Sequence, residues 1–186
     1  MTGKKTHIPG LLILEPKVIE DSRGYFYESF NKEKMLAAGI SMEFLQDNQS
    51  KSQYGVIRGL HYQKNPFAQS KLVRVLEGKI FDVALDIRKG SPMYGSWFGL
   101  ELNSENKFQL FIPKGFAHGF SVLSETAVVL YKCDVYYNPA SEAGIQCMDP
   151  LLKIDWKIEK GKEIISAKDL KQPVFENADH NFIFED

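Results

Sequence analysis

Short apolar or alternating runs recur along the chain and are separated by turn-forming residues. Alternation of apolar and polar residues with a period of two is typical of strands that are buried on one face. The runs lie at residues 11–19, 24–30, 55–63, 71–87, 96–102, 107–113, 118–124 and 127–137. Many short strands at this spacing predict an all-β fold, either a sandwich or a barrel.

The clearest hairpin turns at Glu77-Gly78, and the strand after it separates its side chains by polarity. One face carries Phe81, Val83, Leu85 and Ile87, and the other carries Asp82, Ala84, Asp86 and Arg88. Because successive side chains point to opposite faces, we expect the apolar face of this strand to be core.

Helical patterns are short by comparison. Residues 31–39 offer Asn31 as an N-cap, good helix formers and Gly39 as a C-terminal stop, enough for about two turns. A second short helix is possible within residues 166–173, ending before Pro173. The chain after Pro139 is poor in strand patterns. We therefore expect one domain, residues 1–186, with a surface wrap from about residue 139.

Charge and composition exclude several classes of partner. The chain has 23 Lys and Arg residues against 24 Asp and Glu residues and no long basic run, so no nucleic-acid partner is predicted. No apolar run approaches the ~20 residues of a membrane-spanning helix, and residues 1–10 lack the apolar core of a signal peptide. We expect a cytoplasmic protein with no membrane partner. Cys133 and Cys147 form no CxxC pair and are expected to be buried free thiols.

The stretch "VIRGLHYQK" at residues 56–64 reads as a strand but carries two residues suited to chemistry, Arg58 and His61. Residues three apart in a regular strand point to opposite faces, so the two side chains cannot share one pocket without an irregularity. A glycine inside a strand often marks a bulge, which adds one residue. We therefore predict that Gly59 forms a bulge that turns Arg58 and His61 toward one cavity.

The other histidines are less distinctive. His7 and His180 lie in polar segments and are expected at the surface. His118 alternates with apolar residues, which fits a hydrogen-bonded core histidine and a functional residue equally well. Residues 113–118 fit the P-x-G-x-x-H half of the metal-binding pattern of cupins, which are small β-barrels. The other half of that pattern is missing around His61, and two imidazoles are a poor set for divalent metals. No metal is predicted.

A barrel without a metal can still perform proton chemistry. An imidazole can remove a proton from a carbon next to a carbonyl if a carboxylate orients it and the enolate is stabilised. Tyr131 and Tyr137 alternate onto one largely apolar face and are expected to point into the barrel, although core tyrosines show the same pattern. Asp169 also reads as a plain helix-end carboxylate on this evidence alone.

Several segments together resemble the dTDP-4-dehydrorhamnose 3,5-epimerase family. They match in order and spacing between about residues 8 and 173, and they are residues 20–30, 44–63, 71–92, 112–120, 131–137 and 166–169. The resemblance implies a double-stranded β-helix barrel of the cupin or jelly-roll type, a homodimer, no cofactor and a dTDP-sugar substrate. It also implies that an N-terminal strand is exchanged with the partner subunit.

The resemblance further implies roles for individual residues. His61 matches the catalytic base, Asp169 its orienting carboxylate, Tyr131 the general acid, and Lys71 the cation beside the C4 oxygen. The residues that match substrate contacts are Arg58 and His118 at the sugar and phosphate site, Arg23, Phe26 and Glu28 on the exchanged strand, Gln46, Asp47 and Asn48 in a loop at the thymidine end, and Tyr137, Glu142 and Lys168.

These residue types fit epimerisation of dTDP-4-dehydro-6-deoxy-D-glucose at C3 and C5, because the C4 ketone acidifies both positions. The product would be dTDP-4-dehydro-L-rhamnose, the precursor of L-rhamnose in bacterial polysaccharide. Enzymes that invert C3 or C5 alone, and 3,4-ketoisomerases of related fold, remain alternatives. A metal-dependent cupin oxygenase is less favoured, because two imidazoles are a poor set of metal ligands. A non-catalytic sugar-nucleotide binding barrel is less favoured, because it has no need of a base, an acid and an orienting carboxylate together.

Overall fold

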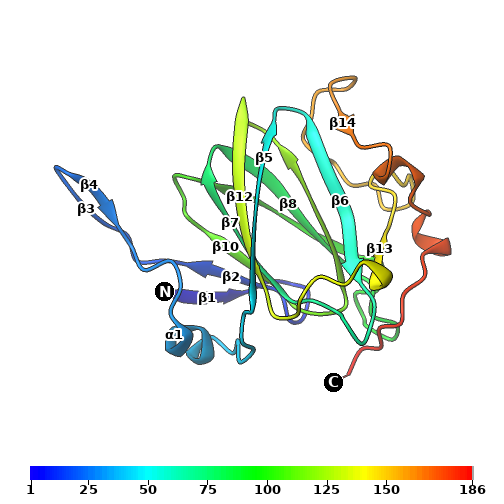
Figure 1. Cartoon of the computed structure of the whole chain (residues 1–186), viewed down its shortest axis with the longest axis horizontal. Helices are drawn as coiled ribbons and strands as arrows, with labels where there is room; N and C mark the ends of the chain where they lie inside the picture. The colour runs from blue at the N-terminus through cyan, green and yellow to red at the C-terminus, as the bar shows by residue number, and fades with distance from the viewer. Residues whose placement is uncertain (186) are drawn as a thin grey trace.

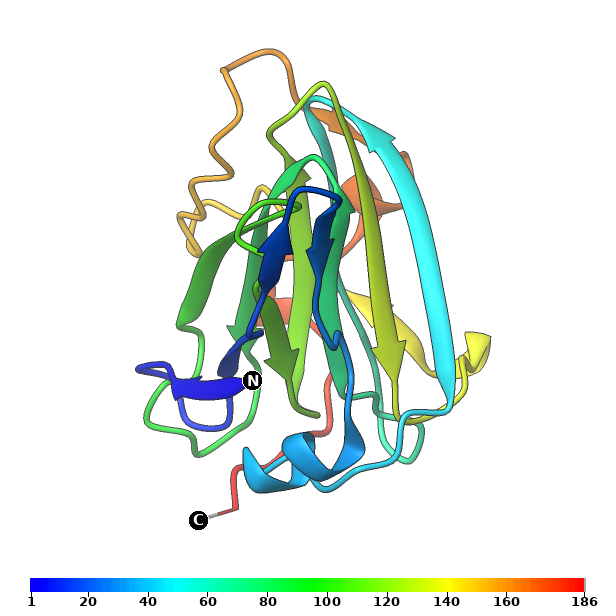
Figure 2. The ribbon, with the colours of Figure 1, turned by 90° about the vertical axis from the view of Figure 1, so that its left-hand side faces the viewer.

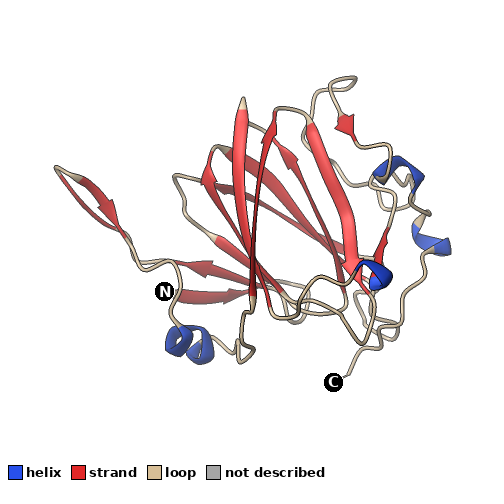
Figure 3. Ribbon diagram, in the orientation of Figure 1, coloured by secondary structure: helices blue, strands red, loops and turns tan. Residues whose placement is uncertain are grey.

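Two β-sheets face each other in the computed structural model, which describes residues 1–185 (Figures 1 and 3). The first sheet has the order β1 (Thr2–Lys5), β2 (Leu12–Glu15), β10 (Gln109–Ile112), β7 (Lys71–Glu77), β12 (Thr126–Cys133) and β5 (Gln46–Gln53). The second has the order β13 (Glu142–Gly144), β6 (Val56–Gln63), β11 (Phe116–Val122), β8 (Lys79–Asp86) and β9 (Trp97–Asn103), with β14 (Ile164–Ile165) added in parallel to β6. The prediction of an all-β jelly roll is confirmed.

The core between the sheets is built from the inward side chains of both. Val73, Val75 and Val129 of the first sheet pack in one cluster with Ile80 and Phe120 of the second. None of these five side chains is more than 4% exposed. Each such burial contributes about 1.5–3 kcal/mol, so the cluster holds the two sheets together.

The outer face of the second sheet is buried as well, because the chain after β13 lies over it (Figure 1). Val83 of β8 packs on this side against Ile145 and Trp156. Asp82 and Ala84, which alternate with Val83, are also 0% exposed. The expectation of a single core face for β8 is therefore incomplete: the alternation separates two kinds of buried face, not a buried face from a solvated one.

Helices are few in the described part of the chain, and none of them is long and apolar enough to span a membrane. Helix α1 (Lys32–Ala37) begins where Asn31 accepts a hydrogen bond from the backbone N–H of Lys34, as the capping pattern predicts. The second expected helix forms only as the short 3-10 turn η2 (Asp169–Lys171). The other two 3-10 turns are η1 (Pro139–Ser141) and η3 (Phe175–Asn177).

A hairpin of β3 (Ile19–Asp21) and β4 (Gly24–Phe26) projects away from both sheets (Figure 1) and lies in front of them, toward the viewer, in Figure 2. Its residues are exposed throughout, and its apolar side chains are not covered: Ile19 is 57% exposed, Tyr25 57% and Phe26 70%. An isolated two-stranded hairpin has little stability of its own in water. The hairpin therefore carries apolar surface that this chain alone leaves in contact with solvent.

Candidate active site

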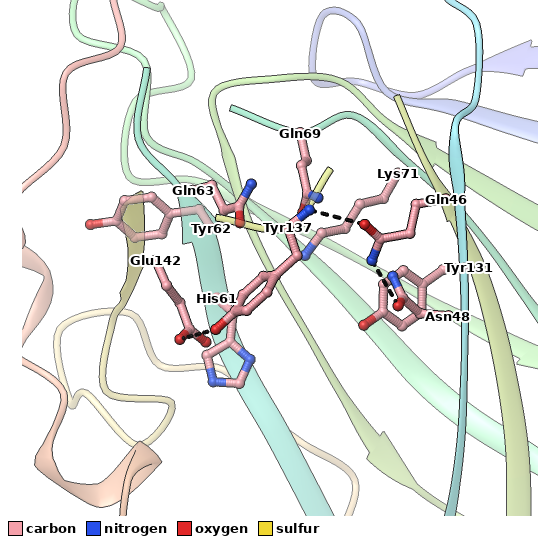
Figure 4. A pocket seen from close by; sticks show the side chains of 10 residues that line it. All are labelled: Gln46, Asn48, His61, Tyr62, Gln63, Gln69, Lys71, Tyr131, Tyr137 and Glu142. Atoms are coloured by element: carbon pink, nitrogen blue, oxygen red, sulfur yellow. Dashed lines mark hydrogen bonds between the residues drawn. The ribbon is translucent and has the colours of Figure 1, made fainter. Parts of the chain in front are cut away.

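A polar cavity lies between the sheets, with its walls on β5, β7, β12 and β6 (Figure 4). It has two adjoining parts of about 210 and 120 Å³, which share the side chains of His61, Lys71 and Tyr131. The larger part is also lined by Gln46, Asn48, Tyr62, Gln63, Gln69, Tyr137 and Glu142, and the smaller by Ser50, Arg58, His118 and Phe120. The shared side chains therefore occupy the middle of one continuous site.

Arg58 and His61 both line this cavity because strand β6 carries an extra residue. His61 pairs with His118 of β11, whereas Arg58 pairs with Phe120, so three steps along β6 match two steps along β11. That is the signature of a β-bulge, which changes the facing of the residues beyond it. The predicted bulge is confirmed. It explains how Arg58 and His61, three residues apart, can face the same cavity.

The bulge depends on Gly59, whose φ of +123° is a conformation that other residues rarely adopt. A Cβ atom on Gly59 would lie 2.6 Å from the Cα of Gly119 and 2.7 Å from the carbonyl oxygen of His118. Both distances are too short for any side chain. The two glycines therefore let β6 and β11 approach closely behind the site.

His61 and Asp169 are joined by a short hydrogen bond at the site. The Nε2 of His61 lies 2.6 Å from Oδ1 of Asp169, whose side chain is only 6% exposed. Burial alone would raise the pKa of Asp169, but hydrogen bonds with His61, Ser166 and the backbone of Gly59 outweigh it and hold that pKa below its usual value. An ionised Asp169 accepts the Nε2 proton, so Nδ1 of His61 carries the lone pair that can accept a proton.

Lys71 and Tyr131 come from neighbouring strands of the opposite wall. The Nζ of Lys71 lies 5.8 Å from the centre of the Tyr131 ring. Burial lowers the pKa of Lys71, although Cys133, Asp82 and Glu142 act against that shift. Burial also raises the pKa of Tyr131, so its phenol keeps its proton at neutral pH. The wall opposite His61 thus presents a poorly solvated cation and a proton donor.

The smaller part of the cavity holds a second histidine and an arginine. His118 is buried, and its Nε2 lies 2.7 Å from Oδ1 of Asp82. Arg58 donates from Nε to Oγ of Ser52 at 3.0 Å, and within residues 1–185 its terminal nitrogens have no side-chain partner, so they can bind a ligand. His118 therefore combines the two readings that the sequence left open, because it is a hydrogen-bonded core histidine and also faces the cavity.

A hydrogen-bonded group of side chains forms the rim of the larger part. The Tyr137 hydroxyl donates to Oε2 of Glu142 at 2.8 Å, and Nζ of Lys168 reaches the same oxygen at 2.7 Å. Strand β12 ends at Cys133, so Tyr137 reaches the cavity from the following loop rather than from the strand. Its position is fixed by its backbone N–H, which donates to Gln46 at 2.9 Å (Figure 4).

Not every residue expected at the site lies there in a single chain. Residues 46–48 form the start of strand β5 rather than a loop, and alternation turns Asp47 away from the cavity. Its carboxylate pairs with Lys132 at 2.9 Å. Arg23, Phe26 and Glu28 do not line the cavity of their own chain.

Two of these three residues, Arg23 and Glu28, form ion pairs with residues close in the sequence. Arg23 binds Asp21 at 2.6 Å, and Glu28 binds Lys34 at 2.7 Å. The side chain of Arg23 remains 88% exposed, so its cationic group is available to a ligand outside this chain's own cavity.

Five lining residues were not proposed from the sequence: Ser50, Tyr62, Gln63, Gln69 and Phe120. Ser50 follows Gln46 and Asn48 at intervals of two, so alternation along the strand could have identified it. No sequence signal marks Gln63 and Gln69. Gln69 donates to the carbonyl oxygen of Val135 at 2.7 Å, and thus helps to hold the loop that carries Tyr137.

The side chains at the site are arranged for proton transfer. Within residues 1–185, no group of three or more His, Cys, Asp or Glu side chains is placed to hold a metal ion. The absence of a metal cofactor itself stays a prediction. An oriented imidazole on one wall, and a phenol with a cation on the other, can remove and return a proton on two sides of a ligand.

Comparison with known proteins agrees with this chemistry. The family model described as dTDP-4-dehydrorhamnose 3,5-epimerase matches residues 5–177. The protein of that name from Shigella flexneri is 51% identical over 177 residues, which cover 95% of this chain and 97% of the relative.

Solved structures of similar proteins extend this agreement to the fold. A crystal structure of dTDP-4-dehydrorhamnose 3,5-epimerase from Elizabethkingia anophelis has a TM-score of 0.90 at 51% identity, covering 94% of this chain and 96% of the other. A Legionella pneumophila dTDP-6-deoxy-D-glucose-3,5-epimerase, solved with dTDP-4-keto-L-rhamnose, has a TM-score of 0.91 at 50% identity, covering 95% and 94%. The chain belongs to the dTDP-4-dehydrorhamnose 3,5-epimerase family.

Proposed function

We propose that the chain epimerises dTDP-4-dehydro-6-deoxy-D-glucose at C3 and C5, with His61 as the base and Tyr131 as the acid. The observation that carries this assignment is the pairing of His61 with Asp169, because His61 lines the same cavity as Lys71 and Tyr131 on the opposite wall. A pure binding site has no need of an oriented base facing a protonated phenol. The family to which the chain belongs supports the same reaction.

Each inversion then proceeds through an enolate. Nδ1 of His61 removes the proton from C3, and the electron pair of the C–H bond moves into the C3–C4 bond while the C4 oxygen becomes negative. Lys71 stabilises that oxygen, and such electrostatic stabilisation is often the largest catalytic contribution. Tyr131 delivers a proton to the other face of C3, the enolate returns to the ketone, and solvent restores both side chains. The same sequence at C5 completes the reaction.

Binding of the nucleotide requires cations near the catalytic residues. The two phosphates of dTDP carry negative charge, and Arg58 lines the cavity with free guanidinium nitrogens. Arginine suits phosphate because its planar fork can donate two hydrogen bonds. Lys168 lies at the rim and is held by Glu142. We infer that the diphosphate lies between these two cations and that the sugar reaches the middle of the site.

We further propose that the chain works as a homodimer of single-domain subunits in the cytoplasm, and that the β3–β4 hairpin reaches the partner's cavity. The support for the dimer is the hairpin itself, which exposes Tyr25 and Phe26 and carries the exposed guanidinium of Arg23, paired with Asp21. Apolar surface of this kind is typical of an interface. Sedimentation analysis tests the dimer: Phe26→Ala is expected to weaken it and raise KM, and a wild-type chain that sediments as a monomer contradicts it.

Deuterium labelling tests the reaction. The protein is incubated with dTDP-4-dehydro-6-deoxy-D-glucose in deuterated water, and the sugar is examined by NMR. Label and inverted configuration at both C3 and C5 are expected. Label at one carbon indicates a mono-epimerase, and an unlabelled, unchanged sugar contradicts the proposed class of reaction altogether.

A further inference from the structure

We propose that Ser166 is a positioning residue that holds the Asp169 carboxylate, and through it the His61 ring, in the geometry needed for proton transfer. The proposal rests on the role of His61 as the base and adds a residue outside the cavity to the machinery of the reaction. Ser166 does not line either part of the cavity, so it acts on turnover only through neighbouring residues, and its hydroxyl is bonded to the backbone of Asp169.

Asp169 needs such support because it does not belong to either sheet. It is the first residue of the 3-10 turn η2, and 108 positions in the sequence separate it from His61. The turn contains only three residues and has no side-chain cap of its own. A catalytic carboxylate on so short an element keeps its orientation only if neighbouring groups fix it.

Ser166 supplies that support from just before the turn. Its Oγ accepts the backbone N–H of Asp169 at 3.0 Å, and its carbonyl oxygen accepts the backbone N–H of Leu170 at 3.0 Å. The first bond spans three residues, as in the capping of a helix start, and fixes the backbone from which the Asp169 side chain projects. Hydrogen bonding with Ser166 also helps to keep the Asp169 pKa low.

Three titratable groups lie near Asp169 and influence how its pKa would respond to the loss of the Ser166 hydroxyl. His61 faces the carboxylate from β6, the Cys147 thiol is close enough for Asp169 to help raise its pKa, and Lys168 is the preceding residue. Cys147 is buried and keeps its proton at neutral pH, since its pKa is raised to about 11. Without the Ser166 hydroxyl, the Asp169 pKa rises, and the carboxylate becomes protonated at a higher pH.

The test compares Ser166→Ala with Ser166→Thr, which keeps the hydroxyl at this exposed position. We expect Ser166→Ala to lower kcat by about 5-fold, the order expected from the loss of one hydrogen bond between a backbone N–H and a hydroxyl. KM is expected to stay within about twofold, and the acidic limb of the kcat profile to move to higher pH. Ser166→Thr is expected to restore both properties.

Ser124→Ala is the matched control, because the Ser124 hydroxyl also accepts a backbone N–H, that of Lys79 at 2.8 Å, away from the cavity. It is expected to leave kcat and the pH profile unchanged. A wild-type kcat and pH profile in Ser166→Ala overturns the proposal. So does a loss that Ser166→Thr fails to restore, or a change confined to KM.

A second measurement does not depend on turnover. The ring N–H proton of His61 is followed by NMR in the protein without substrate and assigned by its disappearance in His61→Ala. Ser166→Ala is expected to shift or broaden this signal, and an unchanged signal overturns the positioning role. A changed signal with a wild-type kcat in Ser166→Ala shows that the contact does not affect turnover and also overturns the proposal, whereas a wild-type kcat in His61→Ala contradicts the role of His61 as the base.

Discussion

Replacing Asp169 by Asn tests the central pair of the site with little change in shape. The substitution keeps a side chain of equal size beside Nε2 of His61 but removes the negative charge that stabilises the protonated ring. The 2.6 Å contact between Nε2 and Oδ1 places the two charges roughly 4 Å apart, which corresponds to about 4 kcal/mol at an effective dielectric constant of about 20. Because the His61 side chain is 32% exposed, solvent reduces this to about 2–4 kcal/mol.

The expected loss is therefore about 30- to 1,000-fold in kcat, since about 1.4 kcal/mol corresponds to a factor of ten. KM is expected to change little, because Asp169 lines neither part of the cavity. The assay follows deuterium incorporation at C3 and C5 of the sugar under saturating and limiting substrate. Asp155→Asn, which removes an exposed carboxylate paired with Lys157, is the control. A kcat within about threefold of wild type in Asp169→Asn would refute the reasoning.

Four further predictions follow from the site. Tyr131→Phe is expected to retain deuterium exchange with retained configuration but to lose inversion, which NMR distinguishes; normal inversion contradicts the role as acid. Lys71→Met is expected to lower kcat by about 100-fold or more without lowering Tm, because it removes a poorly solvated charge; a large drop in Tm contradicts this. Gly59→Ala is expected to cost several kcal/mol in denaturant unfolding, whereas Gly24→Ala, with φ of +125° and no atom within 4 Å, is expected to cost much less; equal losses contradict the close-packing argument. The pKa of Asp169 is lower in the folded protein than its value of about 4 in the unfolded chain, so the ionised carboxylate stabilises the fold above that pH. This contribution disappears as the pH falls through the pKa of the folded state. Wild type is therefore expected to lose more stability on acidification than Asp169→Asn.

The sequence allowed good prediction where a local pattern has one structural meaning. Alternation predicted the strands, and the polar residues around Gly59 required a bulge that β6 indeed contains. Asn31 predicted the start of α1 for the same reason, because a cap acts within a few residues. These features depend on neighbours along the chain.

Features that depend on distant segments were harder to predict. Both faces of β8 are buried because the chain after β13 covers the outer face of the sheet. The sequence of β8 itself contains no pattern that predicts this covering segment. The outward direction of Asp47 follows from its place in β5, which the resemblance had placed in a loop. The pairing of His61 with Asp169 came from the resemblance alone, since no local signal joins two such distant positions.

That distance has a consequence for folding. Local contacts form early and contacts between distant residues form late, because the chain between them must first be ordered. The 108 positions between His61 and Asp169 make their contact one of the slow ones. During refolding, the sheets can therefore acquire their spectroscopic signature before the enzyme acquires activity. The lag between the spectroscopic signal of the sheets and the return of activity would measure the docking of the segment that covers the second sheet. The recovery of turnover would then report the last step of folding.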